Sequence, residues 1–128
     1  MPCDINAPII EIPPEDYGIW FVDAMDNPDK YVDKIVRFKG RVMKPRGMGS
    51  KFFVPGRVAM TCCADDIRFY GYPCNLGRAA QITQRSWKKV TVKFEYEAYR
   101  PMVPKQPVLY MLEMESAEKP EEEVVYLG

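Results

Sequence analysis

The residues best suited to chemistry lie in one short stretch, RVAMTCCADDIRFYGYPC, from Arg57 to Cys74. It holds three of the four cysteines of the chain, and two aspartates follow the adjacent cysteine pair. Thiolates bind zinc and copper(I) well, and carboxylates can complete such a site. The stretch therefore suggests a metal site, with zinc as the first ion to consider. Its ligands would be Cys62, Cys63, Cys74, Asp65 and Asp66, with distant Cys3 as a further thiol.

The spacing of these cysteines leaves two other interpretations open. Structural zinc sites usually contain C-x₂-C pairs, and this stretch lacks them. The thiols would then be buried residues of the core, which is a common environment for free cysteine. Alternatively, they form a disulfide or a redox device. A redox enzyme is the weakest interpretation, because the chain has neither C-x-x-C nor a histidine to lower a thiol pKa.

The position of Cys74 depends on how the chain turns after the cysteine pair. Adjacent residues of a strand point to opposite faces, so one thiol of Cys62 and Cys63 would point inward. A tight turn at Asp65 and Asp66 would leave Cys74 about 20 Å farther along the hairpin. We expect a wider loop to bring Cys74 opposite the pair, with a Cα separation below roughly 7 Å.

The chain contains no histidine, and this limits catalysis. Histidine is the commonest metal ligand and the usual general base near neutral pH. Its absence also excludes Ser-His and Cys-His nucleophiles within this chain. We therefore expect a binding module and not an enzyme.

The net charge is zero, which argues against a dedicated nucleic-acid binder. The charges are nevertheless segregated, because an acidic stretch precedes Lys34 and a purely basic one runs from Lys34 to Arg57. One interpretation is that the acidic segment folds against the basic strand. The other is that Arg37, Lys39 and Arg41 bind an anionic protein partner.

Hydrophobic periodicity predicts a small β-rich protein. Residues 1–15 are rich in proline and predict an irregular arm with a short edge strand near Ile9–Ile12. We expect residues 16–128 to form a single domain. Residues 16–25 predict a short helix, with a short strand as the alternative, and Asn27-Pro28 starts one or two further helical turns. Alternation predicts strands over 34–44, 52–63, 66–72, 87–99 and 107–116, with the second interrupted at Pro55-Gly56. A helical pattern covers 75–86, and residues 119–128 are predicted to be a tail.

This order predicts a mainly β fold, namely a small five-stranded OB-like barrel. It has a short helix between strands 3 and 4 and a short N-terminal helix. A five-stranded sandwich or meander is the competing architecture. No apolar run approaches the roughly 18–20 residues that span a bilayer, so we expect a soluble domain.

Four segments resemble the C-terminal domain of the YcgQ-type proteins, a family of uncharacterised, membrane-associated bacterial proteins. The resemblance runs from about Asp16 onward and is carried, in the same order, by NPDKYVDKIVRFKGRV, FVPGRVAMTCCADDIRFYGYPC, SWKKVTVKFEYEAY and PVLYMLEMES. It implies an OB-like domain, a setting beside a membrane permease, and a functional role for the TCC stretch.

Two functional hypotheses follow from the residues and from the resemblance. In the first, the chain is a metal- or ligand-binding accessory module of a membrane transport system, with a permease as its partner. In the second, it is a protein-interaction module that docks through the basic strand Arg37–Arg41, and its cysteines are structural. A thiol redox protein is the remaining alternative.

Overall fold

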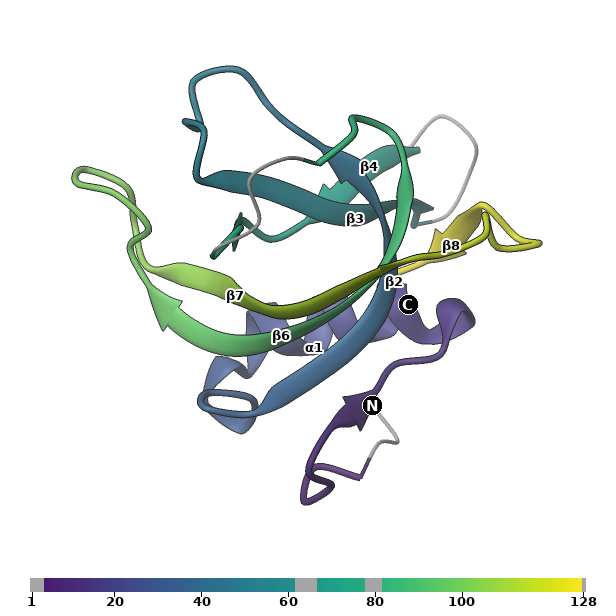
Figure 1. Cartoon of the computed structure of the whole chain (residues 1–128). Helices are drawn as coiled ribbons and strands as arrows, with labels where there is room; N and C mark the ends of the chain where they lie inside the picture. Colours follow the sequence, from purple (N-terminus) through teal and green to yellow (C-terminus); the bar gives the residue numbers. More distant parts are fainter. Residues whose placement is uncertain (1–3, 62–66, 78–81, 128) are drawn as a thin grey trace.

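The computed structural model of the chain describes residues 4–61, 67–77 and 82–127 (Figure 1). Its elements, in chain order, are β1 (Ile10–Glu11), η1 (Pro14–Asp16), α1 (Tyr17–Asp26), η2 (Pro28–Lys30), β2 (Ile35–Met43), β3 (Phe52–Met60), β4 (Arg68–Gly71), β5 (Cys74–Asn75), β6 (Trp87–Glu97), β7 (Gln106–Ser116) and β8 (Val124–Tyr126). Here η denotes a short 3₁₀ helix. The strands curve around a common interior, and α1 lies across one end of it.

The strand pairings form a closed circuit. β2 pairs with β3 on one side and with β6 on the other, and β6 pairs with β7. β7 then pairs in parallel with β5, and β5 returns to β3. β4 and β5 act together as one barrel strand, because both pair with β3. Five strands closed in this order make an OB-like barrel, so the predicted fold is confirmed.

The alternation of apolar residues explains the two central strands. In β2, every second residue from Val36 to Val42 is buried, whereas the residues between are partly exposed. In β6, Val90, Val92 and Phe94 are buried, although Tyr96 at the rim is 41% exposed. Alternate side chains point to opposite faces of a strand, so this pattern places the core inside the barrel.

Helix α1 closes one end of the barrel with its aromatic side chains. The sequence predicts a helix in this segment. Trp20 and Ala24 are fully buried. The Trp20 ring lies 5.2 Å from the ring of Phe38 in β2, and Phe21 stacks on Tyr72 at 4.4 Å. Large aromatic rings fill the end of a small barrel efficiently because each buries much apolar surface.

Three sequence-based expectations need correction or qualification. β3 runs unbroken through Pro55-Gly56, because Pro55 pairs opposite Val42 and Gly56 opposite Arg41. The predicted helix over 75–86 falls partly on residues 78–81, which lie outside the described residues, and its described parts are strand, coil and turn. The predicted tail contains β8, which pairs in parallel with β3.

The two ends of the described chain also contribute to the core. Ile10 and Ile12 are buried, and β1 pairs in parallel with β2. At the other end, β8 lies against α1 at Gly18. A Cβ built on Gly18 would meet the carbonyl oxygen of Tyr126 at 2.0 Å, so only glycine permits this approach.

Arg57 of β3 joins the N-terminal and C-terminal segments from inside the protein. Its side chain is 1% exposed. The guanidinium donates to the carbonyl oxygen of Pro14 at 3.0 Å and to that of Glu122 at 2.7 Å. It also lies 5.5 Å from the Trp87 ring. Burial lowers the pKa of this guanidinium, and the negative charge of Glu123 acts in the opposite direction. A buried cation is tolerated only when it is hydrogen-bonded in this way.

We predict that Arg57→Met lowers the free energy of unfolding by about 3 kcal/mol, because backbone carbonyls lose charged donors that methionine cannot replace. The matched control is Arg41→Met, which removes a partly exposed pair with Glu123 at 3.6 Å and costs below about 1 kcal/mol. Urea unfolding measures both values, and hydrogen exchange shows whether β8 loses protection first. Equal effects of the two substitutions would contradict the linking role of Arg57.

Candidate interaction surface

The cysteines predicted to act together are only partly described. Cys62, Cys63, Asp65 and Asp66 lie outside the described residues. Cys74 lies in β5, opposite Phe53 of β3 and Leu109 of β7, and is 0% exposed.

The register explains why Cys74 lies far from the end of β3. Pairing of β3 with β4 starts at Ala59 and Arg68, so the connection is the wider of the two considered. From this pair the register continues unchanged along β3, through Gly56 opposite Gly71, to Phe53 opposite Cys74. Phe53 and Met60 are roughly 20 Å apart along the strand. Cys62 and Cys63 lie outside the described residues, so their approach to Cys74 stays a prediction.

The environment of Cys74 is that of a structural thiol. Burial raises its pKa well above the usual range, which keeps the thiol protonated. Metal binding requires the thiolate, so burial opposes it. Within the described ranges, no group of three or more Cys, Asp or Glu side chains is arranged to hold a metal ion.

The basic strand contacts acidic residues from both ends of the chain. Arg37 pairs with Glu11 at 2.6 Å, and Arg41 pairs with Glu123 at 3.6 Å. Lys39 lies opposite Lys89 of β6, and both line a groove of about 270 Å³ beside the N-terminal segment. The pair of Arg37 with Glu11 agrees with the acidic N-terminal segment folded onto the strand, whereas Glu123 comes from the C-terminal segment. Partner binding by Arg37, Lys39 and Arg41 stays a prediction.

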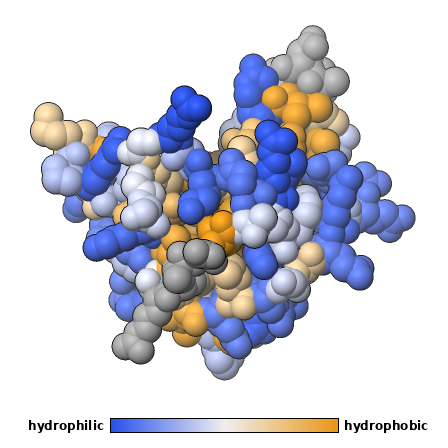
Figure 2. Space-filling model, turned by 45° about the horizontal axis from the view of Figure 1, so that its top comes forward, coloured by the Kyte–Doolittle hydropathy of each residue, from blue (hydrophilic) through white to orange (hydrophobic). Residues whose placement is uncertain are grey.

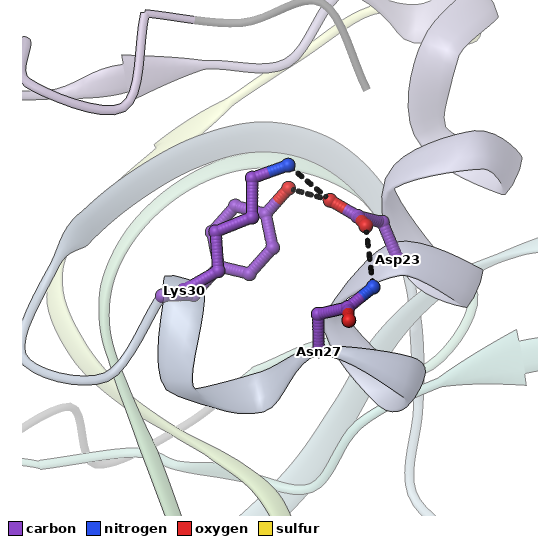
Figure 3. Close-up of polar contacts among 4 residues, drawn as sticks. Asp23, Asn27 and Lys30 are labelled. Carbon is purple, nitrogen blue, oxygen red and sulfur yellow. Dashed lines mark hydrogen bonds and ion pairs between the residues drawn. The ribbon is translucent and has the colours of Figure 1, made fainter.

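Asp23 of α1 is the centre of a compact polar cluster (Figure 3). Its carboxylate accepts hydrogen bonds from Lys30 Nζ at 2.8 Å, the Tyr31 hydroxyl at 2.5 Å and Asn27 Nδ2 at 3.0 Å. Burial of this carboxylate opposes its ionisation, but the three hydrogen bonds outweigh burial and hold the pKa of Asp23 below its ordinary value. With its oxygens occupied, the carboxylate ties α1 to η2 and is not poised as a catalytic base.

Two neighbouring loops carry a dense positive charge. One loop, 44–51, joins β2 to β3, and the other, 98–105, joins β6 to β7. Neither contains Asp or Glu, and we call them the cationic loop pair. Their charged residues are Lys44, Arg46, Lys51, Arg100 and Lys105, all exposed.

Direct contacts hold these loops together. Arg100 Nη1 donates to the carbonyl oxygen of Gly47 at 2.7 Å. Tyr99 contacts Phe52 with ring centroids 5.4 Å apart, and the Arg100 guanidinium lies 5.3 Å from the Tyr99 ring. Both loops lie on the left side of Figure 1, with the 98–105 hairpin outermost. Sequence reasoning missed this surface, although five cations without an acid in two barrel loops could have indicated it.

Comparisons with known proteins identify the family of the chain. Residues 3–127 match the family model of the DUF1980 C-terminal domain, and the chain belongs to that family. The resemblance to the YcgQ-type C-terminal domain is thereby confirmed. No curated protein matches the chain.

Among solved structures, the chain is similar to the telomere capping protein Ten1 from Saccharomyces pombe. The two are 12% identical, over 88% of this chain and 82% of that chain, with a TM-score of 0.42. The strand circuit, and not this likeness, carries the fold assignment. None of the described helices is long and apolar enough to cross a bilayer.

We predict that Asp23→Asn lowers the free energy of unfolding at neutral pH by about 1–2 kcal/mol. A lowered pKa in the folded state stabilises the protein above the unfolded value, which is about 3.9, and this contribution is lost as the pH falls through the folded pKa. The difference between wild type and variant should therefore shrink below pH of about 4. Urea unfolding at several pH values measures it.

The matched control is Asp29→Asn, which removes an exposed carboxylate from η2, the segment that Asp23 anchors. A difference between wild type and Asp23→Asn that stays constant down to acidic pH would contradict the role given to this carboxylate.

Proposed function

We propose that the chain is a non-catalytic binding module that recognises an anionic partner through the cationic loop pair. One observation carries this proposal, namely five exposed cations on two loops that contain no acidic residue and touch each other. Clustered charge of one sign attracts an oppositely charged partner even when the net charge of the protein is zero.

The position of the loops in the barrel supports the same proposal. They connect the first barrel strand to the second and the fourth to the fifth. In OB-like barrels the loops in these two positions border the surface that binds ligands. Helix α1 covers a different part of the barrel, where Trp20 is buried, so the two loops are free of that contact.

The resemblance to YcgQ-type proteins supports a wider setting for this binding. An accessory domain of a membrane transport system, with a permease as its neighbour, is the setting that we propose. The basic strand remains a second docking surface in this proposal, with Lys39 facing the groove beside the N-terminal segment.

We predict that the wild-type protein is retained on immobilised heparin, a polyanion, at low salt. The double variant Lys44→Glu/Arg46→Glu should elute at much lower sodium chloride, because salt screens exposed charges and the loops lose their positive field. The control Lys34→Glu/Lys119→Glu makes the same change in net charge elsewhere and should elute with the wild type. Failure of the wild type to bind, or equal loss in both variants, would overturn the proposal.

A metal site in the connection between β3 and β4 is a second candidate function. In the sequence, Cys62, Cys63, Asp65 and Asp66 all fall between Ala59 of β3 and Arg68 of β4. Thiolates and carboxylates together are a zinc-binding donor set. Because Cys74 is buried beside Phe53, we omit it from this proposed ligand set.

Elemental analysis of purified protein tests the metal site. We predict stoichiometric zinc in the wild type and its loss in Cys62→Ser/Cys63→Ser. Cys74→Ser should retain the metal, because burial raises the pKa of this thiol and disfavours the thiolate. Zinc-free wild-type protein, or loss of zinc in the Cys74→Ser variant, would contradict this assignment.

A further inference from the structure

The outermost part of the cationic loop pair is apolar. Met102, at the tip of the 98–105 hairpin, is 101% exposed and has a φ of 71°. Pro101 and Pro104 flank it, with Arg100 and Lys105 one residue farther out on each side. Figure 2 shows moderately hydrophobic atoms at the left edge, where this hairpin projects, with hydrophilic side chains beside them. The Met102 side chain is long, apolar and fully exposed to water on a projecting hairpin. Transfer of this side chain into an apolar medium is therefore favourable.

We propose that the cationic loop pair docks the protein onto an anionic lipid bilayer, with Met102 entering the interface between headgroups and acyl chains. This inference rests on the proposed function and names its partner. The two cations that flank the apolar tip, Arg100 and Lys105, match such a surface, because anionic headgroups attract Lys and Arg while the acyl region accepts an unbranched apolar side chain. Lys44, Arg46 and Lys51 on the neighbouring loop extend the contact.

The aromatic contacts between Tyr99 of the loop pair and Phe52 of β3 favour a bilayer over a single-stranded nucleic acid. Base stacking needs an aromatic ring with an accessible face. Tyr99 instead contacts the Phe52 ring and the Arg100 guanidinium, and both rings are only partly exposed. Among the exposed large hydrophobic residues of the described chain, the highest exposed fraction belongs to a non-aromatic one, Met102, at 101%.

The charge distribution also favours one orientation on an anionic surface. The segment before β8 contains Glu118, Glu121, Glu122 and Glu123, and it lies on the side of the molecule opposite the hairpin (Figure 1). With the loop pair on the bilayer, these carboxylates point away from the anionic headgroups. The protein would therefore dock with its cationic end inward and its acidic end toward solvent.

Sedimentation with vesicles tests this inference on the full chain. The probes are phosphatidylcholine vesicles with and without about 30% phosphatidylserine. We expect binding only to the anionic vesicles, and a loss of about tenfold or more in Lys44→Glu/Arg46→Glu. Met102→Gln should weaken vesicle binding about fivefold and leave elution from heparin unchanged, since its charge is unchanged. The matched control is Met25→Gln, which alters an exposed methionine of α1 and should bind vesicles like the wild type.

The outcomes separate this inference from the function on which it rests. Retention on heparin without binding to anionic vesicles would overturn the bilayer as partner and leave the binding module standing. Failure on both would overturn both proposals. Tighter binding to a short single-stranded DNA than to anionic vesicles would identify a nucleic acid as the partner instead. Equal vesicle binding by Met102→Gln and the wild type would overturn insertion of the methionine.

Discussion

The arrangement of the N-terminal and C-terminal segments depends on the hydrogen bonds that the buried guanidinium of Arg57 donates. It extends from β3, the strand that pairs with β2, β4, β5 and β8. From there it donates to carbonyl oxygens that precede α1 and β8. Leaving water is costly for a cation, so a buried guanidinium keeps its donors on these acceptors. One side chain thus sets where the helix starts and where the outer strand joins the sheet.

Two regions of the barrel differ in chemistry, namely the region covered by α1 and the cationic loop pair. At one, α1 contributes Trp20 and Phe21 to a tightly packed aromatic cluster, and Asp23 ties the helix to the following turn. At the other, loops rich in cations contact each other through Arg100 and Gly47, and their charged side chains are exposed. A rigid barrel that carries exposed charged loops is a common arrangement in binding proteins, since the scaffold fixes the position of the loops.

The parts of the fold that local patterns determine could be predicted from the sequence. Strict alternation from Val36 to Val42 and from Val90 to Phe94 identified β2 and β6, because a strand with one buried face must alternate. The N-terminal helix followed from the spacing of Trp20 and Ala24. β8 was missed because its three residues form a strand only through pairing with β3, which no local pattern reveals.

The candidate site was harder to predict because it depends on register and on loops. Cys74 lies opposite Phe53 because Arg68 pairs with Ala59 and the same register continues from β4 into β5, and spacing alone does not reveal this register. The cationic loop pair joins segments about fifty residues apart that only barrel closure brings together. Composition did show the segregation of charge, and the pairs of Arg37 with Glu11 and Arg41 with Glu123 account for part of it.

The position of β8 between β3 and α1 affects the order in which the strands pair during translation. Residues Val58–Met60 of β3 have one edge that only Val124–Tyr126 covers among the described strands. A ribosome makes β3 long before β8, so this edge is exposed in the nascent chain while the barrel strands form. Unpaired strand edges can pair with other chains and cause aggregation. This risk ends only when β8 has been synthesised and has paired with β3.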